Sequence, residues 1–263
     1  MPTEEFIIAL FCRIDDSMKE IRKHPQAALF PSETVTLALL FALKGVNTHA
    51  FYRWLCRDWL GLFPRLPERT RLFRLFRTHQ EWATRFLAEP SLLGVIDTYG
   101  IELLHPVRER QKTQTPRIGR KGLSNRRWIV GGKLCLLLNQ HGLVVDWACD
   151  TANVHDTTFH PLIEKVQETT VVLADSGFHK KEGDPENLKL CPRGQWNDRM
   201  LVETMLSLLT TVCHLKKIGH RVWVYFQARL AYTMAVFNLL AQWDGMKPDK
   251  EGFIHLSLAQ FSL

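Results

Sequence analysis

The sequence predicts an α/β protein in which an all-helical N-terminal region precedes a mixed β-sheet flanked by helices. Two observations support this prediction. Apolar residues recur at helical spacing before Pro90, whereas short apolar runs bounded by turn residues predominate after it. Two long segments with helical spacing then follow from residue 197. The 263 residues, 46% of them apolar, suffice for one large domain or two modest ones.

The N-terminal region is predicted to form several helices. Residues 3–21 have helical spacing, and residues 31–45 begin with Pro-Ser-Glu and end on a glycine, as helices often do. Residues 46–61 form the next predicted helix after a short turn. Such a pair is compatible with a helix-turn-helix motif and equally with plain packing. In residues 69–87 arginines alternate with apolar residues, which predicts a basic amphipathic helix that lies on DNA or simply exposes a charged face.

Beyond Pro90 the expected order is three strands, a helix, a strand, a short strand and two helices. Strands are predicted in residues 91–104, in two parts of 127–150 joined by a turn at 139–142, in 169–178 and in 186–193; helices are predicted in 154–167, 197–217 and 221–243. The first two strands are connected by a basic segment that Pro116, Gly119 and Gly122 mark as a loop.

Positive charge is concentrated in this connection. Between His105 and Lys133 nine basic residues face one acid, Glu109, so the local charge of +8 exceeds the net charge of +7 for the whole chain. The nine are Arg108, Arg110, Lys112, Arg117, Arg120, Lys121, Arg126, Arg127 and Lys133. A stripe of this kind suits contacts with phosphates, the alternative being a solvated, mobile loop.

Cysteine usage and hydropathy indicate a soluble, cytoplasmic protein. The six cysteines are scattered and form no C-x-x-C pair, which favours reduced thiols over a disulfide framework or a zinc site. The N-terminus is acidic where a signal peptide would be basic. The longest apolar run, Leu37–Leu43, is far shorter than the ~18 residues of a membrane span.

Three carboxylates stand out. Asp97 ends the apolar run LLGVI, and Asp175 ends the run VVLA. If these strands are parallel neighbours, both aspartates emerge at one edge of the sheet, where two carboxylates repel each other unless a divalent cation lies between them. Glu203, on the polar face of the helix after residue 197, fits as a third ligand. Taken alone, Glu203 and Arg199 equally fit an ordinary surface pair one turn apart.

Together these segments resemble the DDE transposases of bacterial insertion sequences, whose catalytic domain is ribonuclease-H-like. The resemblance covers roughly residues 91–241. It rests on VIDTYGIELL with a basic stretch after it, on the hairpin GGKLCLLLNQHGLVVDWACDTANVHD, on VVLADSGF and on the Arg-x-x-x-Glu spacing of Arg199 and Glu203. The expected organisation is a helical DNA-binding region in residues 1–90 and a catalytic domain with C-terminal helices in residues 91–263.

The resemblance implies metal-dependent cutting and joining of the ends of an insertion sequence. Asp97, Asp175 and Glu203 would bind two Mg²⁺ ions, or Mn²⁺ in their place, with Asp97 bridging both. Hydrolysis would free a 3′-OH, which would then attack target DNA. The partners would be double-stranded DNA, as terminal repeats and as target, and further copies of the chain in a homodimer or larger assembly. The protein would then be associated with the nucleoid.

Further residues are candidates for DNA contacts. They are the basic residues of the connection other than Lys133, together with Arg199, Lys180, Lys181, Trp196, Lys216 and Lys217. The family pattern places a tyrosine three residues before the arginine and a lysine seven residues after the glutamate, where this chain has Trp196 and Thr210. Lys216 and Lys217, about two turns further on, would compensate for the missing lysine. Asp156, in the sequence NVHD, is expected to cap a helix rather than to bind metal.

Three alternatives remain open at the level of sequence. A ribonuclease-H-like nuclease would hydrolyse DNA without joining it, and the long helical N-terminal region argues against this. A catalytically decayed transposase would act only as a DNA-binding protein, which agrees with Thr210. A Rossmann-like binder of a small anion is disfavoured, because no glycine-rich loop follows a strand at the required spacing.

Overall fold

The structure of the chain is a computed structural model that describes residues 2–104, 120–124, 127–191, 199–220, 222–243, 245–246 and 250. The contacts divide it into two compact units. The first comprises the described residues of Met1–Phe86, Leu209–Gly219 and Val224–Leu263, and the second those of Leu87–Leu208 and His220–Trp223. Among the described residues, no helix has the length and apolar character needed to cross a membrane.

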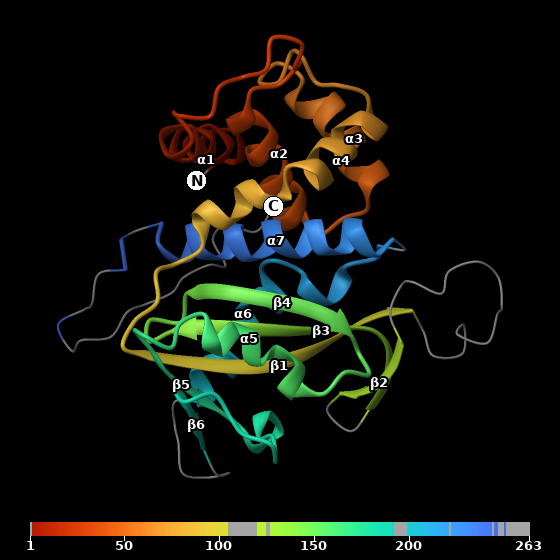
Figure 1. Cartoon of the computed structure of the whole chain (residues 1–263). Helices are drawn as coiled ribbons and strands as arrows, with labels where there is room; N and C mark the ends of the chain where they lie inside the picture. The colour runs from red at the N-terminus through yellow and green to blue at the C-terminus, as the bar shows by residue number, and fades with distance from the viewer. Residues whose placement is uncertain are drawn as a thin grey trace. The chain divides into compact units, whose positions relative to one another are not determined.

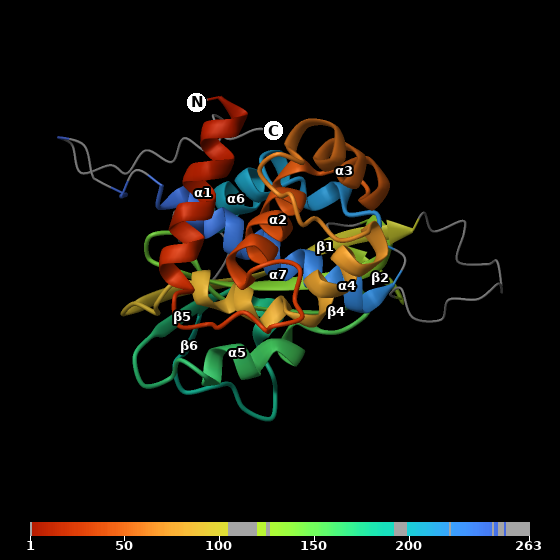
Figure 2. The same cartoon turned by 90° about the horizontal axis from the view of Figure 1, so that it is seen from above.

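The first unit is entirely helical. It contains α1 (Thr3–Ser17), α2 (Pro31–Lys44), α3 (Thr48–Trp54), α4 (Arg69–Thr78) and α7 (Trp223–Ala241), together with the π-helical turn η1 (Leu55–Trp59) and the 3₁₀ segments η2 (Gln80–Phe86) and η6 (Leu215–Lys217). Figures 1 and 2 trace these elements from red at the N-terminus to blue at the C-terminus.

Helix α2 forms the centre of the N-terminal helices and is buried on nearly every side. It begins with Pro31, whose missing N–H costs nothing in the first turn, and the Glu33 carboxylate accepts a hydrogen bond from the Phe30 N–H at 2.6 Å. It ends at Gly45, whose φ of +66° favours glycine. A Cβ at Gly45 would also overlap the imidazole of His214.

Helix α7 is joined to the N-terminal helices by buried polar side chains. The Arg229 guanidinium donates to the Ala42 carbonyl at 3.0 Å and lies 3.8 Å from the centre of the Phe41 ring. Burial lowers the pKa of Arg229 to about 9. Further along, Asn238 donates to the Phe86 carbonyl at 3.0 Å. The expected division placed α7 with the catalytic domain, whereas these contacts group it with the N-terminal helices.

The second unit is a mixed six-stranded sheet with helices, as the predicted fold class requires. Its strands are β1 (Leu93–Leu104), β2 (Arg120–Ser124), β3 (Arg127–Asn139), β4 (Val144–Thr151), β5 (Val171–Ala174) and β6 (Leu188–Leu190). The order is β2-β3-β1-β5-β6, with β4 also paired to β3. β1 is antiparallel to β3 and parallel to β5, so the sheet changes direction at β1. The helical segments are η4 (Asp156–Phe159), α5 (His160–Glu164), η5 (Ser176–Phe178) and α6 (Arg199–Thr211), whose last residues belong to the first unit.

The strand predicted across Asp97 is confirmed, because β1 continues to Leu104 through pairing with β3. Two other expectations about these elements need correction. The end of the basic connection is a strand rather than a loop, because Arg120–Ser124 pairs with β3. Helix α6 stops at Thr211, and His214 then adopts a left-handed φ of 54°. Lys216 and Lys217 therefore do not continue the helix that carries Thr210.

We predict that Tyr232→Phe lowers the free energy of unfolding by about 1–2 kcal/mol, because it removes a buried hydroxyl that donates to two carbonyls. The Tyr232 hydroxyl lies 3.1 Å from the Phe76 oxygen and 3.0 Å from the His79 oxygen, so one proton serves both. Urea denaturation measures the loss. Tyr225→Phe, on the same helix but only half-buried, is the matched control and should change stability by less than about 0.5 kcal/mol. Equal losses in the two variants would contradict the packing of α7 described above.

Candidate active site

The site is built on the parallel pairing of β1 with β5. Leu93 pairs with Val171, Gly94 with Val172 and Val95 with Leu173, so partners differ by 78 in sequence number. Asp97 and Asp175 differ by the same number. Both aspartates lie two residues beyond the last pair, Val95 with Leu173. The same register therefore places Asp97 and Asp175 at the same level, and neighbouring strands in a sheet are ~4.8 Å apart. The expected parallel neighbourhood of the two strands is confirmed.

The two faces of the sheet have different roles at this point. One face packs on η4 and α5 through an apolar cluster that includes Ile96, Val172 and Ala174 of the strands and Ile163 of α5. Because side chains alternate along a strand, Asp97 points away from this cluster. The Asp97 carboxylate accepts a hydrogen bond from the N–H of Thr98 at 2.7 Å and is half-buried.

A third carboxylate, Asp156, reaches the site from the start of η4. Its Oδ1 accepts hydrogen bonds from Thr98 Oγ1 of β1 at 3.0 Å and from Lys133 Nζ of β3 at 2.9 Å. The side chains of Lys133 and Asp156 are only 14% and 23% exposed, so little solvent screens this ion pair. The expected capping role is wrong: His155 occupies the N-cap of η4, and the Asp156 carboxylate bridges two strands instead.

Gly177 allows the second and third carboxylates to approach one another. Asp175 Oδ1 accepts a hydrogen bond from the Gly177 N–H at 2.8 Å, which fixes the carboxylate at the strand end. A Cβ on Gly177 would lie 2.9 Å from Asp175 Oδ1 and 2.6 Å from Asp156 Oδ2. One oxygen of Asp175 and one of Asp156 thus lie close to the position that a Cβ of residue 177 would occupy. Only glycine leaves this position empty.

The negative charge of the site acts on a neighbouring thiol. Burial raises the pKa of Cys135, and the carboxylates of Asp97 and Asp156 raise it further, while the Lys133 ammonium opposes them. Cys135 is fully buried in β3. The thiol therefore stays protonated and is not a candidate nucleophile.

Glu203 is placed differently from the two aspartates. It lies on α6, whose buried stripe consists of Val202, Met205 and Leu209. The Glu203 side chain is exposed. Within the described part of the chain, no three His, Cys, Asp or Glu side chains gather closely enough to hold a metal ion. The role of Glu203 stays a prediction.

The donor set nonetheless suits a hard cation. Asp97 and Asp175 offer only carboxylate oxygens, which are the ligands that Mg²⁺ and Mn²⁺ prefer. The point beside Gly177 has one oxygen of Asp175 and one of Asp156 near it. Lys133 pairs with Asp156 Oδ1 and offsets part of the negative charge of the carboxylates. Asp156 Oδ2 is the oxygen that lies near Gly177.

The structure describes only some of the predicted DNA contacts. Arg108, Arg110, Lys112, Arg117, Arg126 and Trp196 lie outside the described residues, and the side chains of Arg199 and Lys217 are not described either. The side chains of Arg120, Lys121, Lys180, Lys181 and Lys216 are exposed. Arg127 is 70% exposed and donates to Glu102 at 2.9 Å. Lys180 lies 3.3 Å from Glu182, also at the surface.

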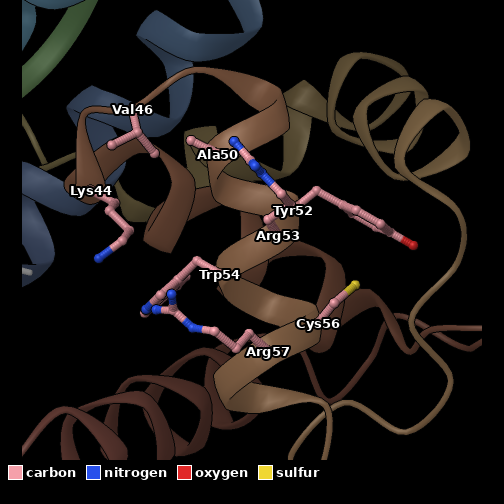
Figure 3. A pocket seen from close by; sticks show the side chains of 8 residues that line it. All are labelled: Lys44, Val46, Ala50, Tyr52, Arg53, Trp54, Cys56 and Arg57. Atoms are coloured by element: carbon pink, nitrogen blue, oxygen red, sulfur yellow. The ribbon is translucent and has the colours of Figure 1, made fainter.

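A second basic region lies in the first unit, on the open groove along α3 and η1 (Figure 3). The Lys44 ammonium lies 4.2 Å from the centre of the Trp54 ring, and burial lowers the pKa of Lys44. Exposed His49, Arg53 and Arg57 follow one another at four-residue spacing and form a polar stripe, in which Arg57 donates to the Asp58 carboxylate at 2.6 and 2.7 Å. Asn47 caps α3 by accepting from the Ala50 N–H at 2.9 Å, so a short turn joins α2 to α3.

Lys133, Thr98 and Gly177 were missed as site residues by sequence reasoning. A signal for Lys133 existed, because strand alternation places it on the same face as Cys135 and Leu137, and a lysine on a buried face needs an anion. Gly177 carried no such signal, since a glycine after a strand is common in any turn.

The comparison with family models identifies part of this unit. Residues 104–199 match the family model described as Transposase DDE domain, so this segment is similar to the DDE domains of transposases. The matched range contains Lys133, Asp156 and Asp175, whereas Asp97 and Glu203 lie outside it. A search of curated proteins finds no match to the chain.

We predict that Lys133→Met lowers the free energy of unfolding by about 2–3 kcal/mol, because it leaves a shielded carboxylate without its cation. Lys165→Met is the matched control. Lys165 lies 2.7 Å from Asp146 but is 63% exposed, and removing such a surface pair should cost less than about 1 kcal/mol. Thermal unfolding of both variants at neutral pH measures the difference. Comparable losses would mean that the pair between Lys133 and Asp156 is screened like a surface pair.

Proposed function

We propose that this chain, whose residues 104–199 are similar to the DDE domains of transposases, is an insertion-sequence transposase that cuts and joins DNA ends by metal-dependent phosphoryl transfer. The observation that carries the proposal is the register that sets Asp97 level with Asp175 on parallel strands. Acids on adjacent parallel strands at a sheet edge are suited to cation-assisted chemistry on phosphates.

We assign the metal-binding role to Asp97, Asp175 and Glu203. A divalent cation bound there supplies Lewis-acid stabilisation of the charge that develops on phosphoryl oxygens. Asp97 and Asp175 are fixed by the strands, whereas the exposed Glu203 must turn towards them. Asp156 is not assigned as a metal ligand in place of Glu203, because Lys133 and Thr98 hold one of its oxygens.

The partner is double-stranded DNA, as element ends and as target. We assign end recognition to the helical N-terminal region, where the stripe of His49, Arg53 and Arg57 lies on a short helix after a tight turn. The basic residues within the DDE segment would hold the phosphates near the cut. Joining two ends implies a homodimer or larger assembly, working on the nucleoid.

A second candidate is a chain that binds DNA without cutting it. The exposure of Glu203 favours it, as does the lack of a cationic residue at Thr210. A nuclease that hydrolyses without joining is the third possibility within the same fold. Cleavage and strand-transfer assays on one DNA substrate separate all three.

We predict that Asp175→Asn lowers cleavage more than about a hundredfold while DNA affinity stays within about twofold, because the amide loses the charge that holds the cation. The substrates are labelled duplexes taken from the DNA that flanks this coding sequence, incubated with Mg²⁺. Asp146→Asn, which alters an acid paired with exposed Lys165, is the control and should cut normally.

Full cleavage by Asp175→Asn would remove that residue from the site. Binding without cutting by the unmodified chain would favour the second candidate.

We predict that Arg53→Ala combined with Arg57→Ala weakens DNA binding and lowers the slope of log affinity against log salt by about 2, since each phosphate contact adds about 0.9. Lys19→Ala, which removes another exposed cation of the same unit, is the control and should leave the slope unchanged. Fluorescence anisotropy over a salt series measures both. An unaltered slope in the double variant would exclude the stripe on α3 and η1 from the DNA interface.

A further inference from the structure

The hairpin of β2 and β3 exposes an apolar pair near its turn. Leu123 of β2 pairs directly with Trp128 of β3, so the two side chains share one face of the hairpin. They are 55% and 56% exposed, among the most exposed large apolar residues that the structure describes. The neighbouring pair, Gly122 and Ile129, is buried, which shows that alternation directs Leu123 and Trp128 outwards.

The position of the hairpin is fixed by a close contact. A Cβ on Gly122 would overlap the backbone carbonyl of Ala152, so β2 lies against the end of β4 and the glycine is required there. The outward direction of Trp128 is therefore set by tight backbone packing on the opposite face. An exposed indole held this firmly loses little conformational entropy when it binds a partner.

Cations surround the apolar pair. The Lys121 ammonium lies 5.1 Å from the centre of the Trp128 ring, and Arg120 and Arg127 occupy the same hairpin with exposed side chains. Glu102 pairs with Arg127, which leaves Arg120 and Lys121 to give the hairpin a net positive charge. Exposed aromatic and aliphatic surface bordered by lysine and arginine fits nucleic acid, because bases stack on the ring and phosphates meet the cations.

We propose that Leu123 and Trp128 form a stacking platform for an unpaired base of the DNA that the active site processes. This inference rests on the proposed function and assigns one contact within it. The indole offers its ring to the base, Leu123 supports one edge, and Lys121 binds an adjoining phosphate.

The platform faces the same side of the sheet as Asp97. Asp97 pairs with Leu136 on β3, and Trp128 lies eight residues earlier on this continuous strand, an even number that keeps both side chains on one face. At ~3.3 Å per residue the separation along the strand is at most about 26 Å. DNA advances ~3.4 Å per nucleotide, so the stacked base lies within roughly eight nucleotides of the cut.

A second copy of the chain is a poorer fit for this surface. Specific protein interfaces bury about 800 Å² on each partner and exclude unpaired charge from their centre. The platform consists of two side chains with cations beside them, and like charges would meet if two copies paired through it. Nucleic acid satisfies both the apolar pair and the cations.

The test compares two DNA duplexes that differ only in one unpaired nucleotide placed within eight nucleotides of the end. The full chain and the variants Trp128→Ala, Trp128→Phe and Leu92→Ala are titrated against both by anisotropy. Leu92, 83% exposed on the same unit, is the matched apolar control. A 2-aminopurine at the unpaired position reports stacking through quenching of its fluorescence.

We expect Trp128→Ala to lose about 5- to 150-fold in affinity for the duplex with the unpaired base, together with the quenching. Its affinity for the paired duplex and its salt slope should stay unchanged, and Trp128→Phe and Leu92→Ala should behave like the unaltered chain.

Equal affinity losses for both duplexes, or retained quenching in Trp128→Ala, would overturn the platform while leaving the proposed function intact. Failure of the unaltered chain to bind either duplex would overturn both. A change of oligomeric state in Trp128→Ala without DNA would assign the surface to self-association instead.

Discussion

The parallel pairing of β1 with β5 is the constraint on which the site depends. A shift of this register by one residue would turn one aspartate to the opposite face, because the side-chain period of a strand is two. The observed register keeps Asp97 and Asp175 level although 78 residues separate them in sequence. The intervening chain forms the antiparallel strands and α5, whose apolar cluster with Ile96 and Val172 holds the register in place.

Repulsion between the acids is managed by cations of two kinds. Lys133 is mostly shielded from solvent on β3, and its ammonium stabilises the Asp156 carboxylate. Under the proposed function, a divalent ion held by Asp97 and Asp175 would be the second cation of the site. Arg229 is a contrasting case in the first unit, where a buried cation stabilises a helix end and has no part in the site.

The sequence predicted the elements that have a clear period. The strands around Asp97 and Asp175, the turn at residues 139–142 and the long C-terminal helices follow from alternation, glycine placement and helical spacing. It also predicted that the two aspartates would meet, because both follow apolar runs. Long-range pairing was harder to foresee. Strand β2 carries charged residues that resemble a loop, and its pairing with β3 overrides that composition.

The partners of Asp156 were beyond the reach of sequence patterns for a similar reason. Its ligands, Thr98 and Lys133, come from strands whose registers with each other are set only in the folded sheet. The grouping of α7 with the N-terminal helices depends on Arg229, Tyr232 and Asn238, three buried residues of α7 whose side chains donate to backbone carbonyls of those helices. Each was visible in the sequence, but nothing there indicated which carbonyl it would meet.

The most direct measurement is anomalous X-ray scattering from crystals of the full chain soaked in Mn²⁺. The account predicts a manganese peak within about 2.0–2.6 Å of carboxylate oxygens from both Asp97 and Asp175. A peak elsewhere on the molecule, or one that contacts neither aspartate, would contradict the view that the β1–β5 register exists to bind a divalent cation.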